Sequence, residues 1–467
     1  MTPTQTPIRK IHLMGICGTA MGSVAAMLKQ QGYQVSGSDE KVYPPMSTFL
    51  EQQGVRIMEG YKPENLSHKP DLVVLGNAIS RGNPELEYAL DSRLYYLSLP
   101  ETLKQFFLRF TQNLVVSGTH GKTTTSSLLA WLFIDAGLQP SYMIGGVPLN
   151  TGQGCAHNSG KYWILEGDEY DTAFFDKRSK FLHYLPELAI INNIEFDHAD
   201  IYNSLDEIKL TFRRLVDIVP RGGMIILNAD NPHAVEVTRH TRSQLIEIGF
   251  SKNAAVRITG LHSDERGSHF DLMGHHFSIP LYGAHNVHNA AMTISAAHSY
   301  QIPLDKIADS LTRFKGVKRR MEVRAEMKGI TIVDDFGHHP TALTETIGAL
   351  RQRYPGRRLW ALFEPRSNTT RRGIFQNELA AALAKADGVF ITQIARADQL
   401  KEGDRLNVPK VAEDIGKTGI PAYFVEHSDA IAEKLPGLLR EGDVVGVFSN
   451  GSFNGLIDKL IAKLSHS

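Results

Sequence analysis

Short apolar runs, each followed by turn residues and a helix-forming segment, recur along the chain. In the first hundred residues, runs at 11–14, 33–36 and 71–75 are bounded by glycine or other turn formers. Buried strands of parallel sheets have this appearance, because helices cover both faces of each strand. We therefore predict an open parallel sheet of the Rossmann type for this part of the chain.

The same alternation returns twice further along the chain. The additional apolar runs that we predict to be strands lie at residues 114–116, 162–165, 188–192, 329–333, 359–363, 388–392 and 443–448. A chain of 467 residues is long enough for about three domains of ordinary size. The prediction is an α/β protein of three domains: a Rossmann-like N-terminal domain at 1–109, a central P-loop ATPase-type α/β domain at 110–316 and a Rossmann-like C-terminal domain at 317–467.

Composition narrows the choice of partners. Lys and Arg total 50, and Asp and Glu total 50, so no net charge draws the chain to nucleic acid or to an anionic membrane. No apolar run approaches the roughly 18 residues of a spanning helix, and the first residues lack the apolar core of a signal peptide. We expect a cytoplasmic protein without membrane insertion. Cys17 and Cys155 are too few for a disulfide framework.

The strongest candidate for chemistry is Gly-Thr-His-Gly-Lys-Thr-Thr at residues 118–124, which follows an apolar run and opens a predicted helix. The amides of a glycine-rich turn and a helix N-terminus attract phosphate. Lys122 and the hydroxyls of Thr123 and Thr124 can reach a terminal phosphate and its Mg²⁺. Val116 stands where the usual P-loop pattern has its first glycine. The alternative is a structural strand-turn-helix that happens to carry these residues.

Two predicted strands of the central domain end in acidic segments. Residues 166–171 read Glu-Gly-Asp-Glu-Tyr-Asp, and residues 193–198 read Asn-Ile-Glu-Phe-Asp-His. A carboxylate at a strand tip beside a phosphate loop commonly holds Mg²⁺, so Glu166 is a candidate ligand. A solvated acidic loop is the alternative. His198 is one of 19 histidines, so an ordinary surface or core position is the alternative for this residue.

The first strand is followed by glycines at positions 15, 18 and 22. This spacing differs from the G-x-G-x-x-G of dinucleotide sites, which weakens a nicotinamide interpretation. A nucleotide diphosphate could still bind at the helix start, and a plain structural turn is the alternative. Asp39 follows the second strand and Asn77 the third, at the edge of the sheet where α/β proteins bind ligands. Asn77 is equally compatible with an ordinary turn.

Other polar groups are suited to a base, a phosphate or a carboxylate. Asn286 and Asn289 lie three residues apart at a predicted helix start, and their amides can pair with a base edge or cap the helix. The cations at 318–320 form either a solvated face or a second contact for phosphate. In the third domain, Arg366 follows a predicted strand, and its guanidinium is suited to a peptide carboxylate.

Six motifs stand in the order found in the Mur ligases, and the chain resembles that family over essentially its whole length. The motifs are Gly-Thr-His-Gly-Lys-Thr-Thr at 118–124, Glu-Gly-Asp-Glu-Tyr-Asp at 166–171, Asn-Ile-Glu-Phe-Asp-His at 193–198, Gly-Ala-His-Asn-Val-His-Asn at 283–289, Gly-Val-Lys-Arg-Arg at 316–320 and Asp-Asp-Phe-Gly-His-His-Pro at 334–340. Mur ligases are ATP-dependent amide synthases of peptidoglycan metabolism. The resemblance therefore implies ATP as a substrate and Mg²⁺ as its companion ion.

The resemblance also implies roles for individual residues. The implied ATP-binding residues are Gly118, Thr119, His120, Gly121, Lys122, Thr123, Thr124, Asn286, Asn289, Arg319 and Arg320. The implied Mg²⁺ ligands are Thr123, Glu166 and His198. The implied UDP-sugar site consists of Gly15, Gly18, Thr19, Ser38, Asp39 and Asn77. The peptide site is assigned to His338, Arg366, Ser367 and Asn368.

Within the family, the chain resembles the ligases that add a tripeptide more than those that add L-alanine. Residues 365–370 read Pro-Arg-Ser-Asn-Thr-Thr, where the alanine enzymes resemble Pro-His-Arg-Tyr-Thr-Arg. The resemblance implies that an acyl phosphate joins UDP-N-acetylmuramate to the recycled murein tripeptide L-Ala-γ-D-Glu-meso-diaminopimelate. Lys122 and His198 would be catalytic, and His338 is a candidate base. The L-alanine ligase of de novo peptidoglycan synthesis is the alternative.

Two other classes of protein and one modification complete the hypotheses. A nicotinamide-dependent oxidoreductase would rest on the first domain alone, and a P-loop regulator would hydrolyse ATP without forming an amide. Some Mur ligases carry a carbamoylated lysine beside a second Mg²⁺. Lys209, which follows His198 at a shorter spacing than in those relatives, is the candidate here.

Overall fold

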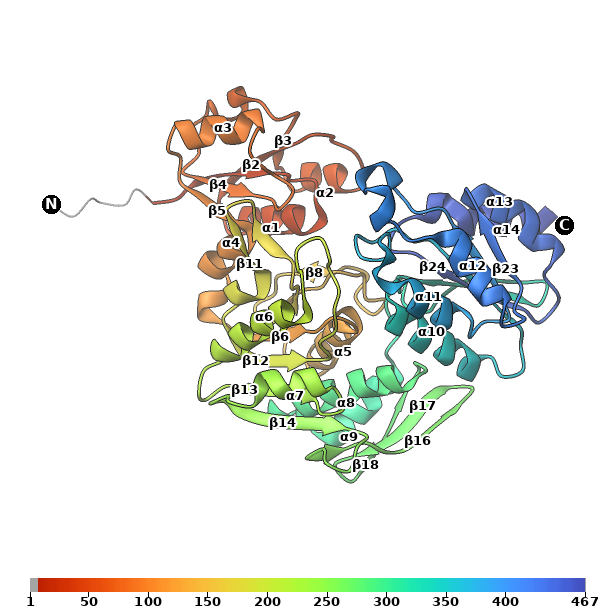
Figure 1. Cartoon of the computed structure of the whole chain (residues 1–467). Helices are drawn as coiled ribbons and strands as arrows, with labels where there is room; N and C mark the ends of the chain where they lie inside the picture. Colours follow the sequence, from red (N-terminus) through yellow and green to blue (C-terminus); the bar gives the residue numbers. More distant parts are fainter. Residues whose placement is uncertain (1–6, 467) are drawn as a thin grey trace.

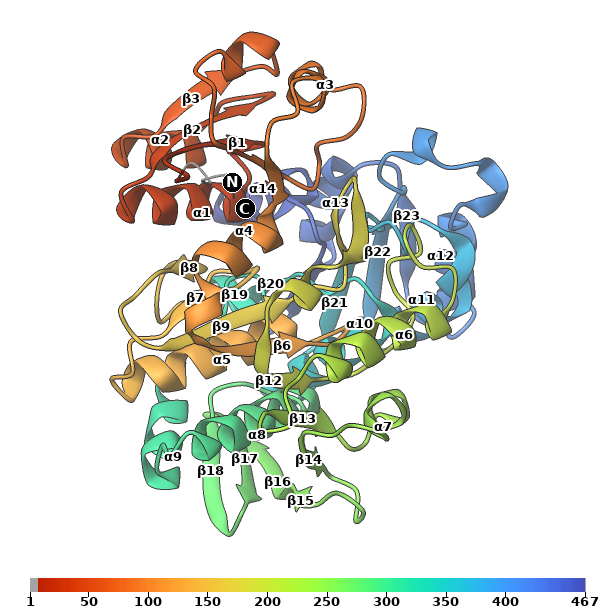
Figure 2. The ribbon, with the colours of Figure 1, turned by 90° about the vertical axis from the view of Figure 1, so that its left-hand side faces the viewer.

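The computed structural model describes residues 7–466 and contains three α/β units, each with its own sheet. In Figure 1 the N-terminal unit is red and orange, the central unit is mainly yellow and green, and the C-terminal unit is blue. Figure 2 shows the N-terminal unit stacked on the central one, with the small antiparallel sheet at the opposite end. The predicted fold class, three α/β domains, is confirmed.

The N-terminal unit is a parallel sheet in the order β3-β2-β1-β4-β5. Its strands are β1 (Lys10–Met14), β2 (Gln34–Asp39), β3 (Arg56–Glu59), β4 (Leu72–Leu75) and β5 (Tyr96–Ser98). Its helices are α1 (Thr19–Gln30), α2 (Met46–Gln52), α3 (Pro84–Asp91) and α4 (Leu99–Phe106). Because the strand order reverses at β1, the loop between β1 and α1 lies where Rossmann-type sheets bind nucleotides.

The central unit has an eight-stranded sheet in the order β15-β14-β13-β12-β6-β9-β7-β8, in which only the β7–β8 pair is antiparallel. Its strands are β6 (Gln112–Ser117), β7 (Ser141–Met143), β8 (Cys155–Ala156), β9 (Tyr162–Gly167), β12 (Pro186–Ile191), β13 (Met224–Asn228), β14 (Gln244–Gly249) and β15 (Val256–Arg257). Its helices are α5 (Lys122–Asp135), α6 (Leu205–Asp217), α7 (Pro232–Thr238), α8 (Ala284–Ser299) and α9 (Leu304–Thr312).

Two small antiparallel elements accompany this sheet. A hairpin is formed by β10 (Asp171–Ala173) and β11 (Asp176–Ser179), and a three-stranded sheet by β16 (Thr259–Asp264), β17 (Gly267–Leu272) and β18 (His275–Ile279). The hairpin comes directly after the acidic segment at 166–171. Ser179 Oγ, at the end of the hairpin, donates a hydrogen bond to the backbone carbonyl of Glu169 at 2.7 Å. This bond ties the hairpin to the acidic segment.

The C-terminal unit is a six-stranded sheet in the order β19-β20-β24-β21-β22-β23, parallel except for β19. Its strands are β19 (Glu322–Met327), β20 (Ile330–Asp335), β21 (Leu359–Phe363), β22 (Gly388–Thr392), β23 (Ala422–Val425) and β24 (Val444–Phe448). Its helices are α10 (Pro340–Arg353), α11 (Gln376–Leu383), α12 (Val408–Gly416), α13 (Ser428–Lys434) and α14 (Leu456–His466).

Strand β6 shows why its sequence is apolar without alternation. Leu114 and Val116 enter a core shared with α5 and α8, whereas Val115 enters the core on the opposite face. That second core also contains Trp163 of β9 and Leu103 of α4, so it continues into the N-terminal unit. Burial on both faces holds the carboxyl end of β6, and the loop that follows it, in a fixed position.

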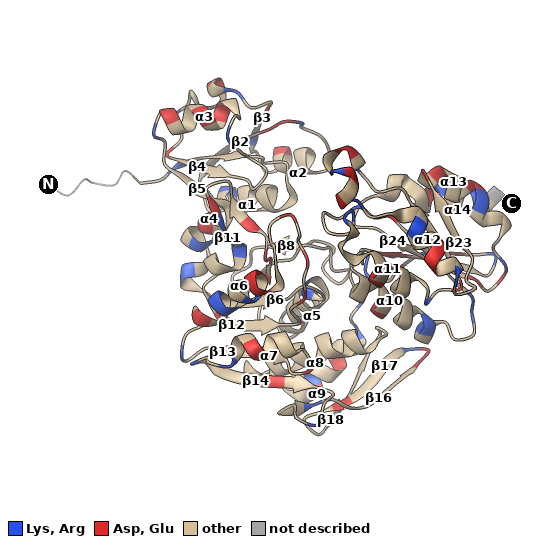
Figure 3. Ribbon diagram, in the orientation of Figure 1, with Lys and Arg blue, Asp and Glu red and all other residues tan. Residues whose placement is uncertain are grey.

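Basic and acidic residues are mixed along the described part of the chain. Figure 3 shows basic and acidic residues interspersed over all three units, in agreement with the zero formal net charge of the sequence. Among the described residues, no helix has the length and apolar character needed to cross a membrane.

Candidate active site

The loop between β6 and α5 has a shape that only glycine permits at two positions. Gly118 has φ 133° and Gly121 has φ 80°, in the region that favours glycine. A Cβ added to Gly121 would lie 2.7 Å from Asn192 Nδ2 and 2.8 Å from Asn289 Oδ1. Asn193 fixes the loop from the side, because its Oδ1 accepts the His120 N–H at 2.8 Å. The loop is therefore packed against the segment that follows β12 and against α8.

Lys122 lies in a buried ion pair beneath this loop. Its Nζ is 2.8 Å from Glu169 Oε2 and donates to the Gly118 carbonyl at 2.6 Å. Burial disfavours the charge on Lys122, but the carboxylates of Glu169, Asp168 and Glu166 together outweigh burial, so the pKa of Lys122 is raised. Burial likewise opposes the charge on Glu169, but Lys122 and His198 lower the pKa of this carboxyl below its usual value. The ammonium is thus held charged at the start of α5.

Glu169 is a functional residue that the sequence analysis missed. It pairs with Lys122 and accepts a hydrogen bond from His198, whose Nε2 lies 2.9 Å from Glu169 Oε1. The sequence motif at 166–171 contains Glu169, but it predicts Glu166 as the carboxylate that binds Mg²⁺. Spacing along the sequence does not distinguish Glu166 from Glu169. The two carboxylates acquire different partners only in the folded chain, where β9 ends and the chain turns into β10.

Thr123 and Glu166 form a second polar group at the loop. Thr123 Oγ1 donates to Glu166 Oε1 at 3.0 Å, and Gly145 N donates to Glu166 Oε2 at 2.7 Å. Adjacent ligands of an octahedral Mg²⁺ with bonds of about 2.0–2.1 Å lie roughly 2.9 Å apart, which matches the first spacing. Burial raises the pKa of Glu166, so a nearby cation would favour its ionised form. These two oxygen donors therefore fit Mg²⁺.

His198, the third predicted ligand, points to Glu169. Burial disfavours its charge, but the Glu169 hydrogen bond and the Asp197 carboxylate outweigh burial and raise the pKa of His198. Its ring lies 4.2 Å, centroid to centroid, from that of Tyr170. Thr123 and Glu166 are thus hydrogen-bonded to each other, whereas His198 is hydrogen-bonded to Glu169. All three predicted ligands line the same cavity.

A cavity of about 820 Å³ opens over the loop, which is large enough for a nucleotide. The predicted ATP-binding and catalytic residues that line it are Thr119, His120, Gly121, Lys122, Thr123, Thr124, His198, Asn286, Asn289, Arg319, Arg320 and His338. Gly118 lies behind the cavity and accepts the Lys122 Nζ hydrogen bond. The residues that the sequence predicts for ATP binding and catalysis therefore lie around one cavity.

Asn286 and Asn289 lie in the first two turns of α8, which begins at Ala284. Gly283 occupies the N-cap position, so the capping explanation for the two asparagines is wrong. Asn286 Nδ2 donates to the Tyr282 carbonyl at 2.8 Å, and Asn289 Oδ1 lies 3.4 Å from Asn192 Nδ2. Both side chains line the cavity and keep polar atoms at its wall.

Arg319 and Arg320 have different surroundings. Arg320 Nη2 lies 3.2 Å from Thr123 Oγ1, beside the phosphate loop. Arg319 Nη2 instead donates to the carbonyls of Ser449 and Gly451 in the C-terminal unit, at 2.5 Å and 2.6 Å. Arg320 is therefore the guanidinium that can reach a phosphate, while Arg319 anchors the segment that connects the central and C-terminal units.

A second cavity, of about 500 Å³, adjoins the first. The residues that line both are Tyr170, Asp197, His198, Phe336 and His338. The predicted peptide-site residues Arg366, Ser367 and Asn368 line only the second. Asn368 Nδ2 donates to Asp200 Oδ2 of the central unit at 2.7 Å, so this cavity lies between the C-terminal and central units.

His338 lies where the two cavities meet. Burial lowers the pKa of His338 despite the nearby Asp197 carboxylate, whose Oδ2 is 3.8 Å from His338 Nε2. The Phe336 carbonyl lies 3.2 Å from Nδ1 and fixes the ring from the other side. A neutral imidazole at this junction can accept a proton from a group that enters from the second cavity.

The predicted UDP-sugar residues surround the loop after β1. Gly15 has φ 82°, and the amide of Cys17 donates to Asp39 Oδ2 at 2.8 Å. Ser38 Oγ is fully buried and lies 3.0 Å from Glu85 Oε1, so this hydroxyl faces the interior. Gly18 is the N-cap of α1 and Thr19 its first residue. Asn77 Nδ2 donates to Asp171 of the central unit at 3.3 Å.

Lys209 does not belong to this site. It lies on α6, where its Nζ is 2.8 Å from Glu236 Oε2 and 3.3 Å from Asp206 Oδ1. It lines neither cavity. The hypothesis of a carbamoylated Lys209 beside a metal is therefore contradicted by its position, because two carboxylates already hold the ammonium against α7.

Comparisons with known proteins cover almost the whole chain. Residues 10–111 match the Mur ligase family catalytic domain, residues 116–297 the Mur ligase middle domain and residues 319–451 the Mur ligase glutamate ligase domain. The UDP-N-acetylmuramate–L-alanyl-γ-D-glutamyl-meso-2,6-diaminoheptandioate ligase of Haemophilus influenzae is 41% identical over 98% of this chain and 99% of its own length.

A solved structure and a relative with a different acceptor complete the comparison. The crystal structure of a murein peptide ligase from Psychrobacter arcticus is 34% identical, with a TM-score of 0.72 and 99% of each chain covered. A UDP-N-acetylmuramate–L-alanine ligase from Pelobacter propionicus is 33% identical over 95% of this chain and 96% of its own length.

Proposed function

This chain belongs to the Mur ligase family, and we propose that it is an ATP-dependent ligase that joins UDP-N-acetylmuramate to L-alanyl-γ-D-glutamyl-meso-diaminopimelate. The observation that carries the proposal is the meeting of two cavities at His198 and His338, one over a phosphate loop and one lined by Arg366. An activated acyl group formed in the first cavity would face an amine entering from the second. The higher identity to the tripeptide ligase than to the L-alanine ligase supports the choice of acceptor.

Amide formation requires that a carboxylate become a good electrophile. The lactyl carboxylate of UDP-N-acetylmuramate attacks the γ-phosphorus of ATP, the bond to the β-γ bridging oxygen breaks, and ADP leaves with those electrons. The acyl phosphate that results is attacked by the tripeptide α-amine. The tetrahedral intermediate then expels orthophosphate, and the ammonium proton passes to a base.

Charge neutralisation and alignment dominate phosphoryl transfer, so the side chains at the loop carry the first step. Lys122 balances the charge that develops on the transferring phosphoryl group, and Glu169 holds the ammonium in position. Arg320 supplies a second cation from the connecting segment, beside Thr123. Mg²⁺ held by Thr123 and Glu166, with His198 nearby, would neutralise phosphate charge and orient the oxygens.

The second step depends on the junction of the cavities. His338 is positioned to accept the ammonium proton, because burial keeps its ring neutral. Arg366 lies in the second cavity, where a guanidinium can bind a peptide carboxylate through two hydrogen bonds. The UDP portion of the donor is assigned to the loop after β1, near Asp39. An ATP-dependent reaction on these precursors points to the cytoplasm and to peptidoglycan recycling.

One assay separates the candidate functions. Orthophosphate release from ATP and UDP-N-acetylmuramate would be measured with L-alanine, the dipeptide, the tripeptide or a tetrapeptide as acceptor, and the products would be identified by mass. The proposal requires the tripeptide to give the highest kcat/KM. Preference for free L-alanine would identify the enzyme of de novo synthesis instead. ATP hydrolysis without any amide product would point to a regulator.

A further inference from the structure

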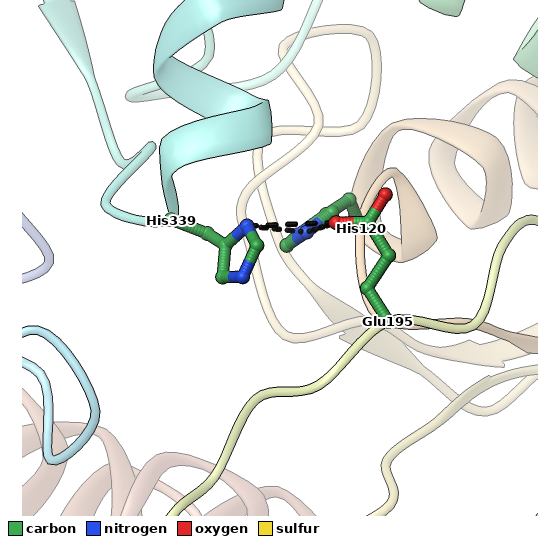
Figure 4. A group of neighbouring side chains, drawn as sticks. All are labelled: His120, Glu195 and His339. Atoms are coloured by element: carbon green, nitrogen blue, oxygen red, sulfur yellow. Dashed lines mark hydrogen bonds and ion pairs between the residues drawn. The ribbon is translucent and has the colours of Figure 1, made fainter. Parts of the chain in front are cut away.

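Three ligand atoms from three distant segments converge at the edge of the nucleotide cavity (Figure 4). His120 Nε2 lies 3.1 Å from His339 Nδ1 and 3.3 Å from Glu195 Oε2. The remaining separation, between His339 Nδ1 and Glu195 Oε2, is 3.6 Å. The triad formed by these side chains contains neither Thr123 nor Glu166, and apart from the ATP contact implied for His120 the ligase reaction described above does not use it.

The spacing of the triad fits a tetrahedral metal ion. Zn²⁺ binds histidine nitrogen at about 2.0–2.1 Å and carboxylate oxygen at about 2.0–2.2 Å, which places tetrahedral ligands roughly 3.3–3.5 Å apart. Of the three separations in the triad, 3.1 Å lies just below this range, 3.3 Å within it and 3.6 Å just above it. One ion could therefore contact all three atoms with small side-chain rotations.

The orientation of His339 also suits metal binding. Its Nε2 lies 3.2 Å from the Phe196 carbonyl, and its Nδ1 accepts the Thr341 N–H at 3.3 Å. Both contacts assign the proton to Nε2, so Nδ1, which lies 3.1 Å from His120 Nε2, carries the lone pair. Metal-bound histidines usually donate their other N–H in this way, which fixes the ring and the tautomer. An ion bound at Nδ1 would displace the long Thr341 contact and the 3.1 Å contact with His120 Nε2.

Glu195 is held in a comparable way. Thr341 Oγ1 donates to Glu195 Oε2 at 2.7 Å, and the backbone amide of Glu195 donates to Thr119 Oγ1 at 2.9 Å. Without a cation, one N–H of His120 must be shared between a carboxylate and a second imidazole. With the His120 proton on Nδ1 instead, His120 Nε2, His339 Nδ1 and Glu195 Oε2 could all bind one ion.

We propose that His120, Glu195 and His339 bind a divalent transition-metal ion of the Zn²⁺ class, distinct from the Mg²⁺ that accompanies ATP. Two imidazoles and a carboxylate select such ions over Mg²⁺, which prefers oxygen ligands. His120 and His339 line the nucleotide cavity, so a fourth position faces that space. His120 and Glu195 belong to the central unit and His339 to the N-cap of α10, so the ion would connect the central and C-terminal units.

The test is a Co²⁺ titration of the full-length chain after removal of metals by a chelator, because tetrahedral Co²⁺ absorbs far more strongly than octahedral Co²⁺. We expect one tetrahedral site, displaced by Zn²⁺ and unaffected by excess Mg²⁺. Glu195→Gln and His339→Gln should each weaken Co²⁺ binding by about 100-fold or more. Thermal unfolding without metal would establish that both variants are folded.

A second group of histidines, on the β16–β18 sheet, provides the matched control. The rings of His262, His269 and His276 stack on the β16–β18 sheet with centroids 4.9 Å and 6.0 Å apart, so they could bind metal adventitiously. The double variant His262→Ala/His276→Ala should keep the tetrahedral site. Loss of the signal in this control, its survival in folded Glu195→Gln, or an octahedral spectrum in the wild-type chain would each overturn the proposal.

Discussion

Two strand-turn-helix loops of this protein share a backbone design and differ in the charges around it. In the N-terminal unit, β1 leads through Gly15 at φ 82° into α1, and in the central unit β6 leads through Gly118 at φ 133° into α5. Asp39 accepts the Cys17 amide in the first loop, whereas the Lys122 ammonium lies beneath the second. Both backbones can hold a ligand in this way, and the nearby positive charge at the second loop favours a triphosphate there.

The polar networks behind the two loops differ in the same way. Behind the first, His12 and Glu85 form a pair with no exposed side-chain surface, and Glu85 also accepts from Ser38. Behind the second, Glu169 holds Lys122 and His198, both of which line the nucleotide cavity. Buried charge alone therefore does not identify the reacting site. The distinguishing feature is whether the charged groups open onto a cavity.

The largest expected effect comes from removing the cation at the second loop. Lys122→Ala should lower kcat by about 10³-fold, because the transferring phosphoryl group loses its fixed positive charge. Steady-state phosphate release at saturating substrates measures the loss, and a thermal unfolding curve establishes that the variant is folded. Lys177→Ala, which removes an exposed lysine, is the control. Near-normal turnover in Lys122→Ala would show that the Lys122 charge does not distinguish the reacting loop from the first loop.

The buried pair behind the first loop should affect folding more than chemistry. Glu85→Ala leaves His12, Ser38 and Asn65 without their shared acceptor and should cost about 3 kcal/mol of stability. Urea unfolding of the N-terminal unit measures this cost, and Glu87→Gln on the same helix is the control. The kcat of the folded fraction should be unchanged. A large drop in kcat at full stability would show that this network takes part in the reaction.

Arg366 tests whether the second cavity holds the acceptor. Arg366→Lys keeps the charge but loses bidentate geometry, so kcat/KM for the tripeptide should fall by roughly 10- to 30-fold. The KM values for ATP and UDP-N-acetylmuramate should not change. Arg351→Lys, on the outer side of α10 and paired with Asp387, is the matched control. A selective rise in the KM for ATP would instead assign Arg366 to the nucleotide.

Asp39 gives the smallest predicted effect and tests the ligand of the first loop. Asp39→Asn should raise the KM for UDP-N-acetylmuramate by about 5- to 10-fold, since one charged hydrogen bond is weakened. The KM for ATP should stay constant. Competition by UDP against the donor, measured in the wild type and in the variant, separates binding from catalysis. An unchanged KM for the donor would exclude Asp39 from its site.

Much of this architecture is predictable from local sequence, and the remainder depends on contacts between distant segments. All ten predicted apolar runs coincide with strands, because burial on both faces leaves a simple pattern. The predicted runs leave out strand β16, whose residues are all exposed and carry no apolar period, and they also leave out β13, although β13 is apolar and its centre is buried. Likewise, the phosphate loop was recognisable from its motif, whereas the partner role of Glu169 and the triad of His120, Glu195 and His339 arise only when separate motifs fold together.

The central claim is that ATP converts the muramyl carboxylate into an acyl phosphate at the Lys122 loop. The most direct test uses UDP-N-acetylmuramate whose carboxylate is labelled with oxygen-18, with ATP, Mg²⁺ and the tripeptide. Mass analysis of the released orthophosphate should find one labelled oxygen per amide formed, because the attacking oxygen leaves on phosphorus. Orthophosphate without the label, alongside a normal yield of amide, would contradict the claim.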